Sequence, residues 1–267
     1  MQLGVLGPLQ VTSGGKSFVP TAPKSRQLLA LLLISANEFV SVDACVEELW
    51  AGNPPNSFMS TLHTYVLHVR RMLKHLPGGK DLLLTRTQGY QLVVPPGTFD
   101  RAVFDDHVRE AREALARNEN HLAASTFRSA LALWRGTVLA DVPASTVITA
   151  YQVELTERRL GVLEQRIEAD LRLGRHANLL PELHKLTQAH PTHENIHAQL
   201  MIALYRSDRR GKAIQVFHHL SRLLGDQLGL QPCNRMQRLH EAIVNCDPAL
   251  VGPVSRGPVR SLCAAAS

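Results

Sequence analysis

The apolar residues between positions 58 and 73 recur at the spacing of an amphipathic helix. When successive residues are placed about 100 degrees apart around an axis, one face collects most of the large apolar side chains. These are Leu62, Val66, Val69 and Leu73, with Tyr65 and Met72 on the flank of the face. The pattern predicts a helix that buries this face in a core and exposes the opposite one.

The opposite face of this helix carries the side chains that DNA-reading helices use. Its members are Ser60, Thr64, Leu67 and Arg71, with His68 beside them and His63 and Arg70 at the edges. Arg, His and Thr can pair with base edges or phosphates in the major groove, and leucine can meet a thymine methyl group. On the helix alone, a solvated face with a few charges explains the pattern equally well.

The continuation of the chain favours DNA binding. The Pro-Gly-Gly sequence at 77–79 predicts the end of the helix, because proline cannot continue it and glycine adopts the conformations of a helix stop. The runs 82–87 and 90–94 predict two short strands joined by a turn at Gln88-Gly89. A helix, a tight stop and a basic hairpin are the components of a winged helix-turn-helix, whose hairpin touches the DNA backbone or minor groove.

The segment before this helix predicts the rest of a small domain. Residues 3–19 predict an antiparallel hairpin, and residues 28–34 are apolar on nearly every side, which predicts a buried helix over 24–36. Ser41 or Asp43 is expected to cap a second helix, with Glu47 and Glu48 turned outward. The residues expected to face inward are Val42, Val46, Leu49 and Trp50.

Helical periodicity then continues from residue 100 to residue 245. The predicted helices lie at 102–118, 121–134, 144–174, 176–189, 193–207, 209–225 and 233–245. Residues 193–232 partly fit a tetratricopeptide (TPR) unit, with Leu200, Leu204, Ala213 and Phe217 at packing positions. Stacked helical hairpins of this kind supply a concave surface for a protein partner. The alternative is a domain that only packs on the first domain or dimerises.

The predicted fold is therefore mainly α, in two domains. A winged helix-turn-helix of the α+β class is expected over residues 1–95, followed by an all-α, TPR-like domain over residues 96–246. The length of 267 residues agrees with two ordinary domains. The tail 247–267 is rich in Pro, Gly, Ser and Ala and lacks periodicity, so we expect it to be disordered.

Charge is distributed unevenly along the first domain. The whole chain carries a net charge of only +6, but residues 57–95 contain five basic residues against one acidic residue, a net charge of +4. Residues 21–56 contain two basic residues against four acidic ones, a net charge of −2. A domain that is basic around its recognition helix and acidic before it is suited to DNA binding on one side.

The spacing of the cysteines and the sequence of the N-terminus indicate in which cellular compartment the protein is expected. The four cysteines, at 45, 233, 246 and 263, form no close pair, which argues against a zinc module or a disulfide framework and suits a reducing environment. The N-terminus lacks the basic start and long apolar run of a signal peptide, and residues 28–34 are too short to span a bilayer. We expect a soluble, cytoplasmic protein that makes no membrane contact.

One motif suggests a different chemistry. His193-Glu194-Asn195-Ile196-His197 spells H-E-x-x-H, which on a helix places two histidines one turn apart for zinc, with the glutamate as general base. Pro191 places His193 in the first, exposed turn, and no convincing third ligand follows, so we expect no metal site. The phosphate-binding and nucleophile-elbow motifs of common enzymes are absent from the sequence. We expect no catalytic residues, no cofactor and no enzymatic activity.

Several segments together resemble a known family. They are residues 25–57, 60–73 and 82–92 in the first domain, and residues 127–136, 154–183 and 197–232 in the second. The first set is similar to the DNA-binding domain of the SARP family (Streptomyces antibiotic regulatory proteins), which is of the OmpR-type winged-helix class. The second set is similar to the bacterial transcriptional activator domain that follows it in these proteins, and the match covers about residues 1–245.

Two features depart from the family pattern. The sequence FMST at 58–61 replaces the small-residue turn usual before the recognition helix, and His68 stands where related winged helices often carry arginine. These departures bear on the operator sequence and not on the class of protein.

The resemblance implies a sequence-specific transcriptional activator of a secondary-metabolite (antibiotic) gene cluster. It implies binding to double-stranded DNA at direct repeats near the promoter −35 element, with a second protomer alongside. It also implies contact with RNA polymerase through its sigma subunit.

We assign the expected contacts by position on the predicted elements. The recognition helix is expected to meet DNA through Ser60 and to read bases through Thr64, Leu67, His68 and Arg71. The residues expected to hold phosphates are Lys24, Arg26, Arg70, Thr85, Arg86 and Thr87. The polymerase contact is expected on the acidic side, through Glu47, Glu48 and the loop 51–57 with Asn53 and Asn56.

Two other functions compete with this one. A helical adaptor whose N-terminal domain binds protein predicts weak salt dependence and no operator. A zinc hydrolase predicts metal in the purified protein.

Overall fold

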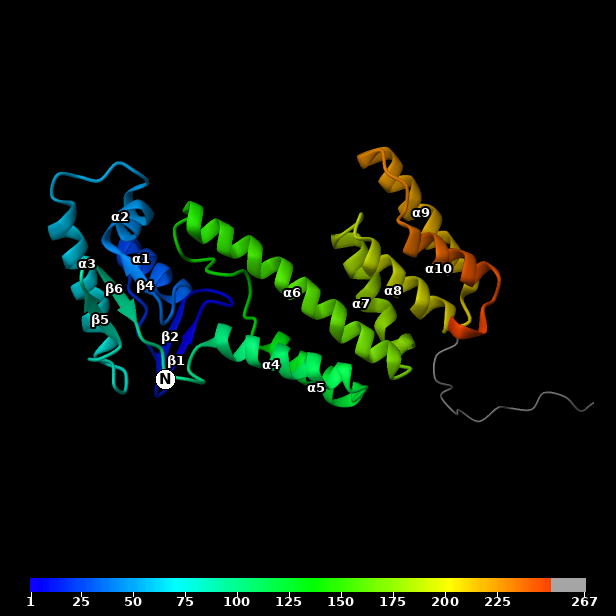
Figure 1. Cartoon of the computed structure of the whole chain (residues 1–267), viewed down its shortest axis with the longest axis horizontal. Helices are drawn as coiled ribbons and strands as arrows, with labels where there is room; N and C mark the ends of the chain where they lie inside the picture. Colours follow the sequence, from blue (N-terminus) through cyan, green and yellow to red (C-terminus); the bar gives the residue numbers. More distant parts are fainter. Residues whose placement is uncertain (251–267) are drawn as a thin grey trace, which may run out of the picture. The chain divides into compact units, whose positions relative to one another are not determined.

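The computed structural model describes residues 1–250, and the chain divides into two compact units (Figure 1). The first unit comprises residues 1–110 and 126–162, and the second comprises residues 111–125 and the chain from residue 163. The predicted division at residue 95 rests on the pattern of expected elements and stays a prediction. Of the predicted tail 247–267, Pro248–Leu250 forms a short 3-10 helix, and residues 251–267 lie outside the described part.

The chain opens with a small antiparallel sheet. Strands β1 (Gln2–Gly4), β2 (Gln10–Ser13) and β3 (Lys16–Ser17) lie in the order β1-β2-β3. The predicted hairpin is thus a three-stranded meander, with Gly14 and Gly15 between β2 and β3 at φ values of +54° and +75°. Glycine reaches this left-handed region without the steric penalty that a Cβ would impose.

Helices α1 (Pro23–Ile34) and α2 (Val42–Trp50) form the inner part of the small domain. Leucines 28, 29 and 31–33 of α1 are buried, as their apolar run predicts. Ser41 caps α2, because its hydroxyl oxygen accepts a hydrogen bond from the Ala44 amide at 3.0 Å. The predicted inward face of α2 is partly wrong: the buried residues are Cys45, Glu48 and Leu49, and Glu48 points inward.

Helix α3 (Phe58–Leu73) and a second sheet complete the winged helix. Strands β4 (Phe39–Ser41), β5 (Leu83–Arg86) and β6 (Gly89–Leu92) are ordered β4-β6-β5, and both pairings are antiparallel. The turn between β5 and β6 falls at residues 87–88, one position before the predicted Gln88-Gly89. Gly89 is the first residue of β6, and the position requires glycine because a Cβ there would sit 2.3 Å from the Val40 carbonyl oxygen.

All seven predicted helices of the second half are confirmed, with ends shifted by at most a few residues. They are α4 (Asp100–Ala116), α5 (Asn120–Ala132), α6 (Thr146–Arg172), α7 (His176–Ala189), α8 (Glu194–Tyr205), α9 (Arg210–Leu228) and α10 (Asn234–Val244). In the second unit α7 packs on α8, α8 on α9, and α9 on α10, as expected for stacked helical hairpins. Among the described residues, no helix is both long enough and apolar enough to cross a membrane.

The first unit contains more than the winged helix. The Asp100 carboxylate at the start of α4 accepts hydrogen bonds from the amides of Val5 and Leu6, at 2.9 and 3.0 Å, and forms an ion pair with Arg135 at 2.7 Å. Asp141 accepts from the Leu9 amide at 2.7 Å. The loop between β1 and β2 is therefore bonded to residues that follow the predicted DNA-binding domain.

Candidate nucleic-acid interface

Helix α3 has the two faces that its sequence pattern predicts. Leu62, Val66, Val69, Met72 and Leu73 are buried. The side chains on the opposite face are exposed, namely Ser60, His63, Thr64, Leu67, His68, Arg71 and Lys74. The predicted orientation of the helix in the domain is confirmed, and its predicted DNA contacts stay predictions.

The hydroxyl groups on the exposed face are already bonded within the helix. Ser60 Oγ donates to the Ser57 carbonyl at 2.9 Å, and Thr64 Oγ1 donates to the Ser60 carbonyl at 3.0 Å. Their protons are therefore occupied, and each side chain offers its oxygen as an acceptor. Leu67, which is 49% exposed, adds an apolar contact between them and Arg71.

Two exposed cations extend this face toward the end of the helix. The side chains of Arg71 and Lys74 make no hydrogen bond or ion pair with the described residues, so both can bind a phosphate or a base. Lys74 is absent from the predicted contacts, although it lies seven residues after Leu67 and therefore on the same side of the helix. Met59, 40% exposed in the first turn of α3, is a further exposed side chain that the predicted contacts do not include.

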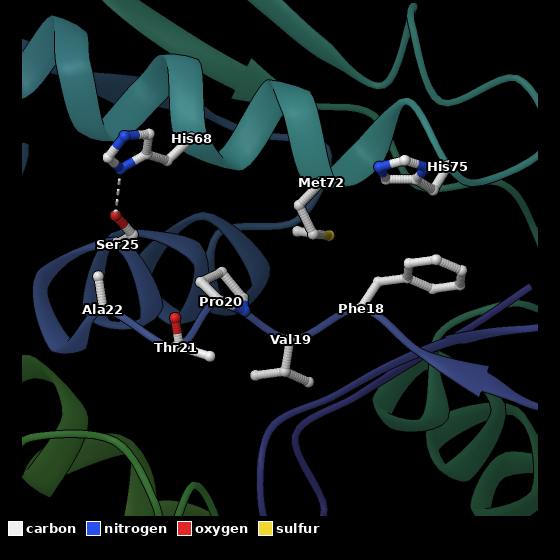
Figure 2. Close-up of a pocket in the computed structure, with 9 residues that line it drawn as sticks. All are labelled: Phe18, Val19, Pro20, Thr21, Ala22, Ser25, His68, Met72 and His75. Atoms are coloured by element: carbon white, nitrogen blue, oxygen red, sulfur yellow. Dashed lines mark hydrogen bonds between the residues drawn. The ribbon is translucent and has the colours of Figure 1, made fainter.

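His68 lies on the flank of the face, beside α1. Its Nδ1 is 3.4 Å from Ser25 Oγ, and both residues line a hollow of about 470 Å³ (Figure 2). The hollow continues along the loop 18–22 to His75, whose ring stacks on Phe18 with centroids 5.5 Å apart. His68 therefore borders the predicted base-reading face and points toward α1.

The wing is joined to the recognition helix by Arg70. Its Nη2 donates to Thr85 Oγ1 at 2.6 Å and to the Leu83 carbonyl at 3.3 Å. Both residues belong to β5, the outer strand of the wing. Arg70 and Thr85 were expected to hold phosphates, and the structure shows that they also bond to each other.

Thr85 and the two other predicted contacts of the wing, Arg86 and Thr87, are exposed. Arg86 donates through Nε and Nη2 to Gln91 Oε1, at 2.9 and 2.8 Å, and the Gln91 amide donates to the Asn37 carbonyl at 2.8 Å. Thr87 lies in the turn. The wing thus presents one arginine whose position is set by its neighbours on the sheet.

Lys24 and Arg26, two further predicted phosphate ligands, are engaged inside the protein. Lys24 donates to the Leu49 carbonyl at the end of α2. Arg26 donates to the Pro20 carbonyl at 3.1 Å and pairs with the Asp141 carboxylate at 3.2 Å. The Lys24 contact joins α1 to α2 within the small domain, and the Arg26 ion pair joins the small domain to a residue that follows it in the chain. The predicted interface therefore rests mainly on α3 and the wing.

The residues proposed for polymerase contact differ in their exposure to solvent. Glu47, Asn53 and Asn56 are exposed. Glu48 is only 5% exposed, and its carboxylate accepts from Gln27 Nε2 at 3.0 Å and Ser145 Oγ at 2.8 Å. The expectation that Glu48 faces a partner is corrected, because its acceptor oxygens are used in the interior.

The H-E-x-x-H motif does not assemble as a metal site. His197 is 2% exposed, and its Nε2 donates to the Pro191 carbonyl at 3.0 Å. Burial, the main cause, lowers the pKa of His197. Glu194 accepts from the Cys233 amide at 2.7 Å. Within residues 1–250, no group of three histidine, cysteine or carboxylate side chains is arranged to hold a metal ion.

Comparison with known proteins agrees with this geometry. Residues 15–92 match the family model "transcriptional regulatory protein, C terminal", and residues 99–244 match the bacterial transcriptional activator domain. The chain is 46% identical over 256 residues to the regulatory protein DnrI of Streptomyces peucetius, covering 94% of both chains. It is 36% identical over 251 residues to AfsR of Streptomyces coelicolor, covering 94% of this chain and 25% of AfsR.

A solved structure is similar over almost the whole chain. The structure of Mycobacterium tuberculosis EmbR in complex with a low affinity phosphopeptide matches with a TM-score of 0.89 and 31% identity. The match covers 95% of this chain and 66% of that one. The chain thus spans nearly all of DnrI but only part of AfsR and EmbR.

Proposed function

Because this chain belongs to the SARP family, in which an OmpR-type winged helix precedes a bacterial transcriptional activator domain, we propose that it activates promoters by binding direct repeats. Family membership makes it a transcriptional regulator, and regulators of this family bind DNA. The proposal adds two protomers side by side near the −35 element and control of a secondary-metabolite gene cluster. It places the protein in the cytoplasm and assigns it no catalytic role and no cofactor.

The observation that carries the proposal is the exposed face of α3. Within residues 1–250 the side chains of Arg71 and Lys74 have no hydrogen-bond partner there, and Leu67 and Thr64 lie next to them on the same face. An arginine in this position can bond the O6 and N7 atoms of guanine, and an exposed leucine can meet a thymine methyl group. The wing supplies a second contact beside the helix, with Arg86 near its turn.

The polymerase contact is proposed on the side that precedes α3. Glu47 and the loop 51–57, including Asn53 and Asn56, are exposed there. An acidic and polar surface of this kind would complement a basic segment of a polymerase subunit, proposed to be sigma, because electrostatic complementarity favours specific docking. Charge reversal at Glu47 should reduce transcription from the target promoter and leave operator affinity unchanged.

The test is binding of the purified protein to promoter fragments and to random DNA across a series of salt concentrations. Tight, specific binding with a steep negative salt slope is expected, because phosphate contacts release counterions. Arg71→Ala should weaken operator binding by about 1–3 kcal/mol, since a base contact is lost. Arg109→Ala on α4, which removes an exposed arginine outside α3 and the wing, serves as the control.

The same experiment separates the competing function. A helical adaptor would bind promoter DNA no more tightly than random DNA. Operator binding by Arg71→Ala as tight as that of the unaltered protein would refute the assignment of α3.

A further inference from the structure

The recognition helix and the wing are joined by a polar contact close to the wing's turn. Arg70 leaves α3 on the side facing the hairpin and reaches Thr85, which is two residues before the turn at 87–88. A second hydrogen bond from the same guanidinium nitrogen goes to the Leu83 carbonyl. The contact therefore spans from the helix to the outer strand of the wing.

Because of the position of β5 in the sheet, the contact with Arg70 adds a link between this strand and the rest of the domain. In the order β4-β6-β5, β5 has a strand neighbour on one side only, which is β6. Thr85 pairs with Tyr90 in the register, so both side chains lie on the same face of the hairpin, where Tyr90 is buried and Thr85, nearer the turn, is exposed. Arg70 therefore links the outer strand to α3 directly.

We propose that Arg70, acting through Thr85, sets the spacing at which the recognition helix and the wing contact DNA. Arg70 is a positioning residue, and its neighbour Arg71 is the exposed arginine that meets the bases. Charge-assisted hydrogen bonds hold a geometry more firmly than neutral ones, and Arg70 makes one to a side chain and one to the backbone. This inference rests on the proposed function, because it assumes that α3 and the wing both contact one operator.

The distance between the DNA sites that α3 and the wing contact can be changed by altering the operator. One inserted base pair between the bases under α3 and the contacts of the wing moves the two apart by about 3.4 Å and about 35 degrees. A wing fixed to α3 cannot follow that displacement, whereas a released wing can follow part of it. Sensitivity to the insertion therefore reports the link between helix and wing.

The experiment uses the full chain, an operator selected from random DNA, and that operator with one inserted base pair. The variants are Thr85→Val, which removes the acceptor with little change of shape, Thr85→Ser, which keeps it, and Arg70→Met. The unaltered protein and Thr85→Ser should lose affinity about tenfold or more on insertion, whereas Thr85→Val and Arg70→Met should lose much less. Both should also bind the original operator more weakly, and the double variant should be no weaker than the single ones.

Other outcomes overturn the inference. If Thr85 touches a phosphate directly, Thr85→Val will weaken binding equally in the presence and absence of Arg70, and the two losses will add. Equal sensitivity to the insertion in all variants also overturns it. Failure of the unaltered protein to select any operator would instead refute the proposed function itself. Amide hydrogen exchange without DNA gives a separate check, because Arg70→Met and Thr85→Val should both speed exchange in β5.

Discussion

The Cys45 thiol shows how burial changes the chemistry of one side chain. Cys45 is completely buried in α2, and burial, with a smaller contribution from the Glu48 charge, raises its pKa to about 12. Because the thiolate is the reactive form, Cys45 should resist a maleimide at pH 8, whereas the exposed Cys233 and Cys246 should react. Mass spectrometry of labelled peptides measures this, and labelling in urea is the control. Rapid labelling of Cys45 in the folded protein would contradict its placement.

Two adjacent glutamates provide a second test at the residue scale. Glu48→Ala should destabilise the protein by about 2–4 kcal/mol, because it leaves the donors of Gln27 and Ser145 without their acceptor in the interior. Glu47→Ala removes an exposed carboxylate from the same helix and should change stability by less than about 0.5 kcal/mol. Thermal melting of the two variants compares them, and equal melting temperatures would contradict the inward orientation of Glu48.

The outward prediction for Glu48 failed for an identifiable reason. Charged residues are seldom buried unless they are paired, so two consecutive glutamates were both placed on the surface. The partners of Glu48 come from Gln27 and Ser145, which are far from it in the sequence. Helical spacing did contain a signal, since Cys45, Glu48 and Leu49 fall on one face.

Among the elements, those with long periodic patterns were predictable and strand β4 was not. The two faces of α3 follow from sixteen residues of regular spacing. Strand β4 has only three residues, too few to show alternation, and it forms by pairing with β6, about fifty positions later in the chain. The sequence also could not predict that Arg70 bonds to the wing while its neighbour Arg71 is exposed, because this difference depends on where β5 lies in space.

Gly89 tests the pairing between β4 and β6. A Cβ at this position would lie 2.3 Å from the Val40 carbonyl oxygen and 2.5 Å from the Phe39 ring, so β4 must move away. Gly89→Ala should therefore destabilise the protein by about 1–3 kcal/mol. Gly161→Ala on α6 is a matched control, because its Cβ would meet open space and alanine favours the helix by about 0.5–1 kcal/mol. Chemical denaturation distinguishes the two, and a neutral Gly89→Ala would contradict the close approach of the strands.

At the scale of the whole chain, the compact units cut across the order of family domains. The family models meet between residues 92 and 99, yet residues 126–162 belong to the same unit as the winged helix. Sequence patterns could predict both domains but not this division, because it is made by contacts such as Asp141 with the Leu9 amide. The winged helix and residues 126–162 of the activator domain therefore belong to one structural unit.

Substitution of Asp100 can test whether the winged helix and the activator segment form one structural unit. Its carboxylate bonds the amides of Val5 and Leu6 and pairs with Arg135, and its side chain is only 12% exposed. Asp100→Ala should lower stability by about 2–3 kcal/mol, because two amides and a guanidinium lose their acceptor. Asp106→Ala on the same helix removes only an exposed pair with Arg109, which contributes about 0–1 kcal/mol.

The same two variants show whether the N-terminal sheet and the activator segment unfold together, when operator binding is measured near the melting temperature. If the N-terminal sheet and the activator segment are one cooperative structure, Asp100→Ala will lose DNA binding at a lower temperature than Asp106→Ala, although neither residue lies on α3 or the wing. Limited proteolysis should then cleave the first unit early in both its N-terminal sheet and residues 126–162. Early cleavage confined to the N-terminal sheet, with operator binding intact, would mean that the winged helix is stable without the activator segment.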